Sequence, residues 1–333
     1  MKVVVLFGQS IECLDLPIAP LFQQWARVRV ESAGLCGTDV AKLTNFNLPA
    51  NHTGVLGHEF FGQVVEVNGS ANNISAGDWV ACMPIVACGS CDACIRHKEN
   101  LCVKAEAIGR TIQGAFAEFV NVPLENLTKV EPPPHDSYVL TDPLAVCLHS
   151  ANLVSRTSSG SSCLVIGDGA IGCLLAWLLL KRGHEVSIKG IHPENLRLVE
   201  KMGARLLNAD VCSKSYDEVY ETVGRSQPQT LDESLRAVKA GGSVVVLGVY
   251  AQGYNYSLVA RELFIKEATL MGSNGYTRKE FEETAMLIGE NKEELAVLLS
   301  HRFSLSQFLD ALEAARKKKG FTAKIVLKPG GLS

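Results

Sequence analysis

Four cysteines in one short segment have the spacing of a metal-binding site. Cys88, Cys91, Cys94 and Cys102 follow the pattern C-x2-C-x2-C-x7-C. Four thiolates surround a zinc ion tetrahedrally at about 2.3 Å and leave no position for water or substrate. The pattern therefore predicts a structural zinc ion in a lobe at about residues 86–104, a loop with little apolar core of its own. An iron–sulfur cluster, which also uses four cysteines, is the alternative.

A glycine-rich segment has the pattern of a dinucleotide-binding turn. It reads Gly167-Asp168-Gly169-Ala170-Ile171-Gly172, between apolar residues 163–166 and apolar residues 173–180. In a strand–turn–helix unit, these glycines permit the tight turn and bring the backbone close to a pyrophosphate at the helix N-terminus. A glycine-rich turn in another α/β fold is the alternative. The residues predicted to hold the cofactor here are Gly167, Gly169, Ala170, Ile171 and Gly172.

The end of the next predicted strand bears on the choice of cofactor. About 20 residues after the glycine motif, an Asp or Glu usually holds the ribose 2′-OH of NAD. That position is Gly190, and Lys189, His192 and Arg197 lie near it. Because a small residue flanked by cations suits a 2′-phosphate, the sequence favours NADP over NAD. The alternative is that the three cations are solvated loop charges.

A second, mixed set of metal-binding side chains lies in the first third of the chain. Cys36 stands in the segment Gly34-Leu35-Cys36-Gly37-Thr38-Asp39, and His58 and Glu59 follow Gly57. Alone, each is more often an ordinary core or surface residue. Together, a thiolate, an imidazole and a carboxylate leave a fourth zinc position open to water or substrate. This set predicts a catalytic zinc ion.

The elements that position these residues change in character along the chain. Short alternating runs in the first half predict an antiparallel β unit; they cover residues 25–31, 62–67, 78–83 and 115–122. After the three prolines 132–134, a predicted helix passes through Leu144, Leu148 and Ala151. Alternating strands and helices then predict a parallel sheet with crossover helices; they cover residues 163–166, 171–181, 185–188, 193–202, 231–238 and 243–247. A helix at 279–288 and a strand at 324–328 follow.

Composition excludes several classes of partner. The 333 residues suggest about two domains, and 32 basic against 35 acidic residues give a net charge of −3. Such a balance predicts no nucleic-acid or anionic-lipid partner. No apolar stretch reaches the roughly 20 residues of a membrane span. The apolar run at residues 3–7 is too short for a signal segment, so we expect a cytoplasmic protein. In such a reducing compartment, clustered cysteines are more often metal ligands than disulfides.

In combination, these motifs resemble the zinc-containing medium-chain dehydrogenase/reductase family, which includes alcohol, sorbitol, threonine and butanediol dehydrogenases. The resemblance rests on segments 36–39, 57–59, 77–80, 114–119 and 142–145, the four-cysteine lobe and the glycine motif, in the family's order. Segments 272–276 and 323–327 resemble the polyol and diol branch. The resemblance implies an α/β fold with a Rossmann doubly wound domain at 147–276. It also implies a GroES-like β-rich catalytic domain at 1–146 and 277–333.

The resemblance also implies roles for single residues around a catalytic zinc ion. Cys36 and His58 match its ligands, and Glu59 matches a carboxylate that approaches the zinc-bound water. Asp142 stands where the family has a further acidic ligand, usually one methylene longer. Direct contact and contact through water both stay open for it, and Cys147 is a possible substitute.

Five further positions matter for proton transfer and cofactor binding. Thr38 matches the hydroxyl that bonds the substrate oxygen and relays its proton, and Asp39 matches the carboxylate that orients the zinc histidine. Lys324 falls where some members have a basic partner for the cofactor. Many members end the relay in a histidine where this chain has Ala41. The relay then passes through cofactor ribose and water, or through His52.

The implied activity is hydride transfer between a nicotinamide cofactor and a small secondary alcohol, diol or polyol, or the matching ketone or aldehyde. Phe46 and Leu48 are candidates for lining the substrate pocket. The resemblance implies two zinc ions per chain and a homodimer or homotetramer. The alternatives are a non-catalytic dinucleotide-binding protein on the same scaffold and a zinc-free enzyme of the quinone-reductase kind.

Overall fold

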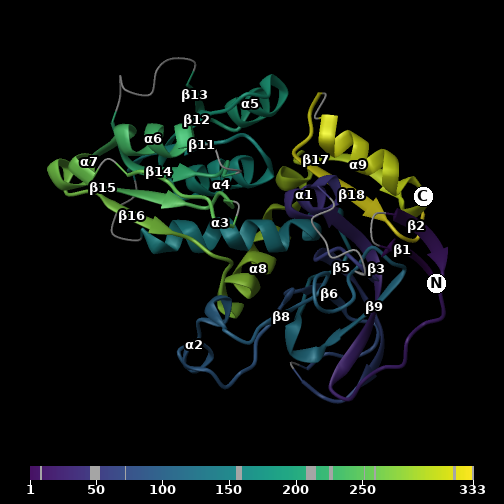
Figure 1. Cartoon of the computed structure of the whole chain (residues 1–333). Helices are drawn as coiled ribbons and strands as arrows, with labels where there is room; N and C mark the ends of the chain where they lie inside the picture. Colours follow the sequence, from purple (N-terminus) through teal and green to yellow (C-terminus); the bar gives the residue numbers. More distant parts are fainter. Residues whose placement is uncertain are drawn as a thin grey trace. The chain divides into compact units, whose positions relative to one another are not determined.

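The chain forms two compact units, one of which is discontinuous in sequence. The computed structural model describes residues 1–7, 10–45, 53–71, 73–154, 160–207, 215–224, 228–250, 252–258, 260–317 and 320–331. The first unit comprises Met1–Ala145 and Tyr276–Ser333, and the second comprises Val146–Gly275. In Figure 1, where the colours follow the sequence, the second unit is teal to green, and the two segments of the first unit are purple to blue and yellow.

A six-stranded parallel sheet forms the centre of the second unit. Its order is β13-β12-β11-β14-β15-β16, and every neighbouring pair is parallel. Numbered from β11, this is the doubly wound order 3-2-1-4-5-6 of dinucleotide-binding sheets. The predicted parallel sheet is confirmed. The strands are β11 (Ser162–Ile166), β12 (Glu185–Lys189), β13 (Arg205–Leu206), β14 (Tyr216–Glu221), β15 (Val238–Val246) and β16 (Thr269–Gly272).

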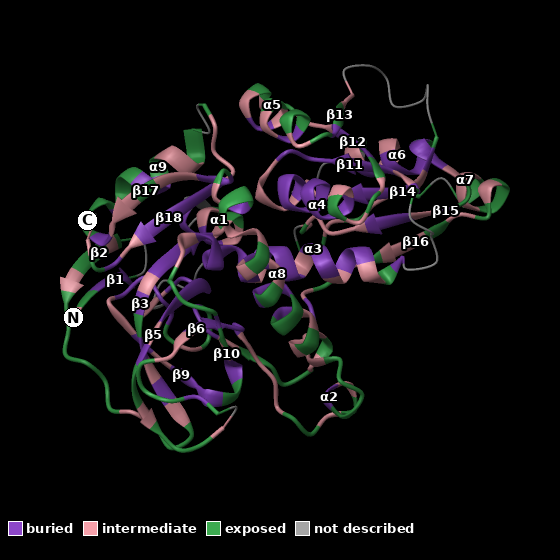
Figure 2. Cartoon of the chain, turned by 180° about the vertical axis from the view of Figure 1, so that it is seen from behind, coloured by how far each residue is buried: buried purple, intermediate pink, exposed green. Residues whose placement is uncertain are grey.

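Helices cover this sheet. The helix α4 (Ala170–Lys181) packs on β11 and β12, and α6 (Pro228–Ala237) packs on β14 and β15. Every residue of α4 from Gly172 to Leu179 is buried, and Figure 2 shows this helix in purple. A helix that is apolar all round must be buried on all sides. The smaller helices α5 (Pro193–Lys201) and α7 (Ala260–Lys266) lie against β12 and β15 respectively.

The first unit is built on a mostly antiparallel sheet, in the order β10-β6-β5-β3-β18-β17, with β9 also paired to β3. Only the pair β17–β18 is parallel among the described strands of this sheet. The helix α9 (Phe308–Lys317) connects these two strands, and parallel neighbours need such a crossover. The strands are β3 (Trp25–Leu35), β5 (Glu59–Asn68), β6 (Trp79–Cys82), β9 (Phe119–Pro123), β10 (Leu127–Lys129), β17 (Leu299–Ser304) and β18 (Lys324–Lys328).

The burial pattern of strand β3 shows how the chain leads into the interior of the unit just before Cys36. In its first half, buried Val28 and Val30 alternate with Arg27 and Arg29, which are less buried. Such a period of two places one face against the core. Its last four residues, 32–35, are all buried. The chain therefore leaves the strand inside the unit.

The remaining elements of the first unit are short or connect the sheets. The strand β1 (Lys2–Phe7) pairs with β2 (Ser10–Asp15) and β4 (Thr53–Val55). The helix α8 (Arg278–Ala296) begins with a capping box formed by Thr277 and Glu280. The others are α1 (Gly37–Asn45), α2 (Asp92–Ile95), β7 (Ile85–Val86), β8 (Glu106–Ala107), η1 (Glu99–Leu101), η2 (Leu124–Asn126), η3 (Asp136–Leu140) and η5 (Leu305–Gln307). The helix α3 (Thr141–Leu153) begins in this unit and continues into the second. No described helix has the length and apolar character of a membrane span.

Candidate active site and metal centres

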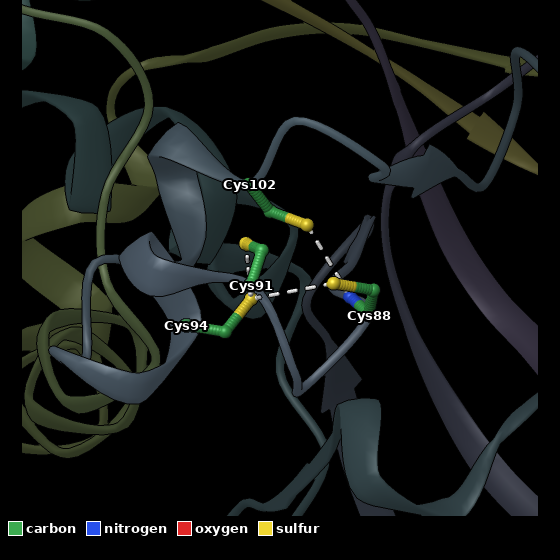
Figure 3. A group of neighbouring side chains, drawn as sticks. All are labelled: Cys88, Cys91, Cys94 and Cys102. Carbon is green, nitrogen blue, oxygen red and sulfur yellow. Dashed lines mark hydrogen bonds between the residues drawn. The ribbon is translucent and has the colours of Figure 1, made fainter.

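The four-cysteine lobe brings its sulfur atoms together. The Sγ atoms of Cys88, Cys91, Cys94 and Cys102 all lie within 4.8 Å of one another, and Figure 3 shows them gathered around one point. The antiparallel pair β7–β8 closes the base of this loop. The short helices α2 and η1 bring Cys94 and Cys102 back toward Cys88. The arrangement is the closed set of four that the spacing predicts.

Local hydrogen bonds favour the thiolate form that a metal requires at Cys88 and Cys91, whereas burial raises the pKa of Cys94. The backbone amides of Ser90 and Cys91 lower the pKa of Cys88 to about 6. The backbone N–H of Cys88 in turn donates to Cys102 Sγ at 3.3 Å. Because the thiolate is the metal ligand, an all-sulfur set with such donors fits a zinc ion.

The mixed set predicted to bind a catalytic metal also comes together. One ligand atom each from Cys36, His58 and Glu59 lies within 4.8 Å of the others. Cys36 follows β3 directly, and His58 and Glu59 stand at the start of β5. The two strands are antiparallel, with Gly34 opposite Glu59. This register places residues from two segments side by side at one end of the strand pair.

Asp39 and Thr38 lie against this set. His58 Nδ1 is 3.5 Å from Asp39 Oδ1, and both side chains are buried. Burial lowers the pKa of His58, but the nearby Asp39 and Cys36 charges outweigh it and raise that pKa well above its usual value. The Thr38 hydroxyl donates to Cys36 Sγ at 3.3 Å. The negative field at His58 is one in which a buried cation is stabilised.

Glu59 forms a buried ion pair that the sequence motifs do not reveal. Lys324 Nζ donates to Glu59 Oε1 at 2.8 Å and to Oε2 at 2.6 Å. The two side chains are 2% and 4% exposed. A Cβ atom on Gly34 would lie 2.4 Å from Glu59 Oε2, so glycine is required there. The sequence assigns Lys324 to the cofactor, and the structure places its ammonium on Glu59.

Asp142 lies outside the close group of Cys36, His58 and Glu59 among the described residues. The buried Tyr276 hydroxyl donates a hydrogen bond to Asp142 Oδ1. Burial raises the pKa of the Asp142 carboxyl group. Cys147, the possible substitute, donates instead to the carbonyl of Ile171 in the second unit, at 3.4 Å.

The glycine motif adopts the turn that a dinucleotide requires. It links β11 to α4, and Gly167 has φ +115°, a backbone conformation that favours glycine. A Cβ on Gly172 would meet the Gly167 carbonyl oxygen at 1.9 Å, whereas a Cβ on Gly169 would meet open space. Gly172 thus allows close packing, and Gly169 leaves the start of α4 accessible. Ala170 and Ile171 form the first turn of α4, and a helix N-terminus has backbone N–H groups without a partner inside the helix.

The cations predicted to favour NADP all have acidic neighbours. Lys189 Nζ lies 2.8 Å from Glu233, and Arg197 lies 3.4 Å from Glu194. His192 Nδ1 lies 2.8 Å from Asp168 Oδ1. Gly190 follows β12 directly, as predicted from the sequence.

Three residues predicted from the sequence are not among those that the structure describes, and two contacts were not predicted. Phe46, Leu48 and His52 lie outside the residues that the structure describes. Sequence reasoning missed a role for Tyr276, although it noted the segment 272–276. It also missed Asp168, whose place inside the glycine motif was the only signal.

Two family models match the chain in succession. The alcohol dehydrogenase GroES-like domain matches residues 23–132. The glucose dehydrogenase C-terminus matches residues 136–325, which is more than half of the chain. The two matches together cover both units.

Individual relatives agree with these family models. A D-altritol 5-dehydrogenase of Agrobacterium fabrum is 31% identical over 304 residues, which cover 89% of this chain and 90% of that protein. An L-threonine 3-dehydrogenase of Bacillus subtilis is 28% identical over 338 residues, covering 95% and 94%. A zinc-binding dehydrogenase of Sinorhizobium meliloti, solved bound to NADP, matches with a TM-score of 0.90 and 28% identity over 98% of this chain and 99% of that one. The chain therefore belongs to the zinc-containing medium-chain dehydrogenase/reductase family, in the branch of the sorbitol and threonine dehydrogenases.

Proposed function

We propose that this NAD(P)-dependent alcohol dehydrogenase acts on a small secondary alcohol, diol or polyol, or on the matching ketone or aldehyde. The reaction moves a hydride between the carbinol carbon of the substrate and the nicotinamide cofactor. Relatives named as altritol, galactonate and galactitol 1-phosphate dehydrogenases support a polyol-type substrate. The observation that carries the proposal is the group formed by the half-buried Cys36 and the buried His58 and Glu59, in a chain that also has the glycine motif between β11 and α4.

We assign Cys36, His58 and Glu59, which we call the open group because they leave one metal position unfilled, to a catalytic zinc ion. Cys36 and His58 would hold the ion, with Glu59 beside it and Asp142 in direct or water-mediated contact. A zinc ion there supplies a Lewis acid for the substrate oxygen. Asp39, 3.5 Å from His58 Nδ1, keeps that nitrogen turned toward the carboxylate and leaves Nε2 for the metal. A second zinc ion is assigned to Cys88, Cys91, Cys94 and Cys102.

Thr38 is assigned the first step of proton transfer. Its hydroxyl lies beside Cys36 Sγ, where the substrate oxygen would approach the metal. A hydroxyl both donates and accepts a hydrogen bond, so it can take the substrate proton and pass one on. Ala41 has no group that continues the relay, which leaves cofactor ribose with water, or His52, to carry the proton onward.

The glycine motif is assigned the pyrophosphate of the cofactor, through Gly167, Gly169, Ala170, Ile171 and Gly172. The preference for NADP over NAD stays a prediction that rests on Gly190, His192 and Arg197. The role of Lys324 as a partner of the cofactor also stays a prediction. A cytoplasmic homodimer or homotetramer remains the expected form of the protein.

The decisive experiment compares the wild-type protein with Cys36→Ser. Purified protein is incubated with a panel of alcohols, diols, polyols and ketones and with NAD or NADP, and nicotinamide absorbance is followed. We expect turnover of a secondary alcohol or polyol by the wild type and none by Cys36→Ser, with two zinc ions falling to one. Full activity in Cys36→Ser overturns the role of the open group. One zinc ion and no turnover in the wild type favour the non-catalytic dinucleotide-binding alternative.

A further inference from the structure

A carboxylate reaches the end of β12 although the sequence has none there. In doubly wound sheets, the acid that ends the second strand holds the cofactor ribose. Here the residue after β12 is Gly190. A Cβ atom on Gly190 would lie 2.3 Å from Asp168 Cγ and 2.4 Å from Asp168 Oδ2. The Asp168 carboxylate therefore occupies the space that a side chain at position 190 would fill.

Hydrogen bonds from the start of α5 fix this carboxylate. The backbone N–H of His192 donates to Asp168 Oδ2 at 2.5 Å, and the His192 ring Nδ1 lies 2.8 Å from Oδ1. Asn195 Nδ2 donates to the Asp168 carbonyl oxygen at 2.7 Å. Asp168 is only 3% exposed. It thus joins the glycine turn to the end of β12 and to the start of α5.

We propose that Asp168 is a specificity-determining residue for the cofactor, taking the place of the acid that usually ends the second strand. This proposal rests on the proposed function, because it assumes that a nicotinamide dinucleotide binds at the glycine motif. Its negative charge disfavours the 2′-phosphate of NADP, and its hold on His192 places an imidazole beside the ribose. Gly190 is required because any larger residue displaces the carboxylate.

Two of the three neighbouring cations pair with other carboxylates and not with Asp168. Lys189 and Arg197 already face Glu233 and Glu194. Only His192 contacts Asp168 among the three cations from which the sequence predicts NADP. The Asp168 charge therefore lowers the affinity for NADP relative to NAD. It does so even if the other residues of the site favour NADP. Two like charges close together in a partly buried site repel by an amount that changes affinity about tenfold or more.

The test is Asp168→Asn, which keeps the shape and one of the two acceptor oxygens but removes the charge. The dissociation constants of NAD and NADP are measured by titration calorimetry on the purified, zinc-loaded protein. We expect the affinity for NADP relative to NAD to rise about tenfold over the wild-type ratio. A ratio within twofold of the wild type overturns the proposal. A wild-type protein that binds neither nucleotide contradicts the proposed function instead, so the two failures are distinguishable.

Two further variants support the comparison. Asp168→Ser also removes the charge, with a side chain shorter than asparagine, so the affinity for NADP relative to NAD rises as it does in Asp168→Asn. An unchanged or lower ratio overturns the proposal even where Asp168→Asn does not fold. Asp217→Asn is the matched control, because Asp217 contacts Lys239 and Ser162 at the opposite end of β11. We expect it to leave the ratio unchanged, and a shift as large as that of Asp168→Asn also counts against the proposal.

Discussion

The two metal-binding groups differ in what holds them in place. The four-cysteine lobe takes all its ligands from 15 consecutive residues, 88–102, and apolar residues around it are exposed, with Val103 at 83% and Ile95 at 68%. The open group takes its residues from separate segments and lies in the core, with Glu59 at 1% exposure. We therefore expect the lobe to depend on a metal for its order, and the open group to be ordered by the sheet around it.

The largest expected effect concerns catalysis at the open group. Cys36→Ser replaces a thiolate with a weak ligand, so the Lewis acid is lost and turnover falls about a thousandfold or more. Circular dichroism and the unfolding midpoint should stay close to those of the wild type, because the β core holds the site. Steady-state kinetics and metal analysis give the answer. Loss of folding together with activity would contradict this difference between the two groups, because the open group would then also depend on its metal for order.

Lys324→Met tests the ordering of the open group by the fold. The change leaves the buried Glu59 carboxylate without its ion-pair partner, which costs about 3 kcal/mol or more of unfolding free energy. Urea unfolding followed by tryptophan fluorescence measures it. The double variant Glu59→Gln with Lys324→Met is the control and should recover most of the loss. A single variant as stable as the wild type would show that this ion pair does not order the site.

Cys102→Ser tests the opposite dependence in the lobe. Removing one of four thiolates weakens zinc binding, so the loop at residues 86–104 opens and limited proteolysis there accelerates about tenfold, whereas the sheet of the first unit stays resistant. Mass spectrometry locates the cleavage. Cys82→Ser, outside the lobe in the buried strand β6, is the control and leaves the loop protected. Equal resistance of Cys102→Ser and the wild type would mean that the lobe is ordered without its metal.

The smallest effect belongs to the contact between Tyr276 and Asp142. Tyr276→Phe removes one hydrogen bond to the carboxylate while the ring keeps its stacking on Phe281. We expect about 1 kcal/mol of lost stability and a severalfold loss of turnover, with the zinc content unchanged. Thermal unfolding and kinetics on the same preparation separate the two. Unaltered kinetics would exclude any positioning of Asp142 by Tyr276.

Local patterns made much of the molecule predictable. The strand–turn–helix around Gly167, Gly169 and Gly172 depends on neighbours within one motif, and so does the spacing of the four cysteines. The short runs of alternating residues likewise predicted strands such as β3. Two parts of the site escaped this reasoning. Lys324 and Glu59 are 265 positions apart, and Tyr276 and Asp142 are 134 apart, so no periodicity links them.

Asp168 shows most clearly the difference between what the sequence predicts and what only the tertiary structure reveals. The sequence by itself determined the family, the two kinds of unit, the four-cysteine lobe and the ligand types of the open group, because these follow from residue type and short spacing. It also left position 190 without an acid. Only the tertiary structure decided that Asp168 fills this place and that Lys324 neutralises Glu59. Parallel pairing of β11 with β12 and the adjoining of β18 to β3 create both contacts, and strand order is a property of the whole packed sheet.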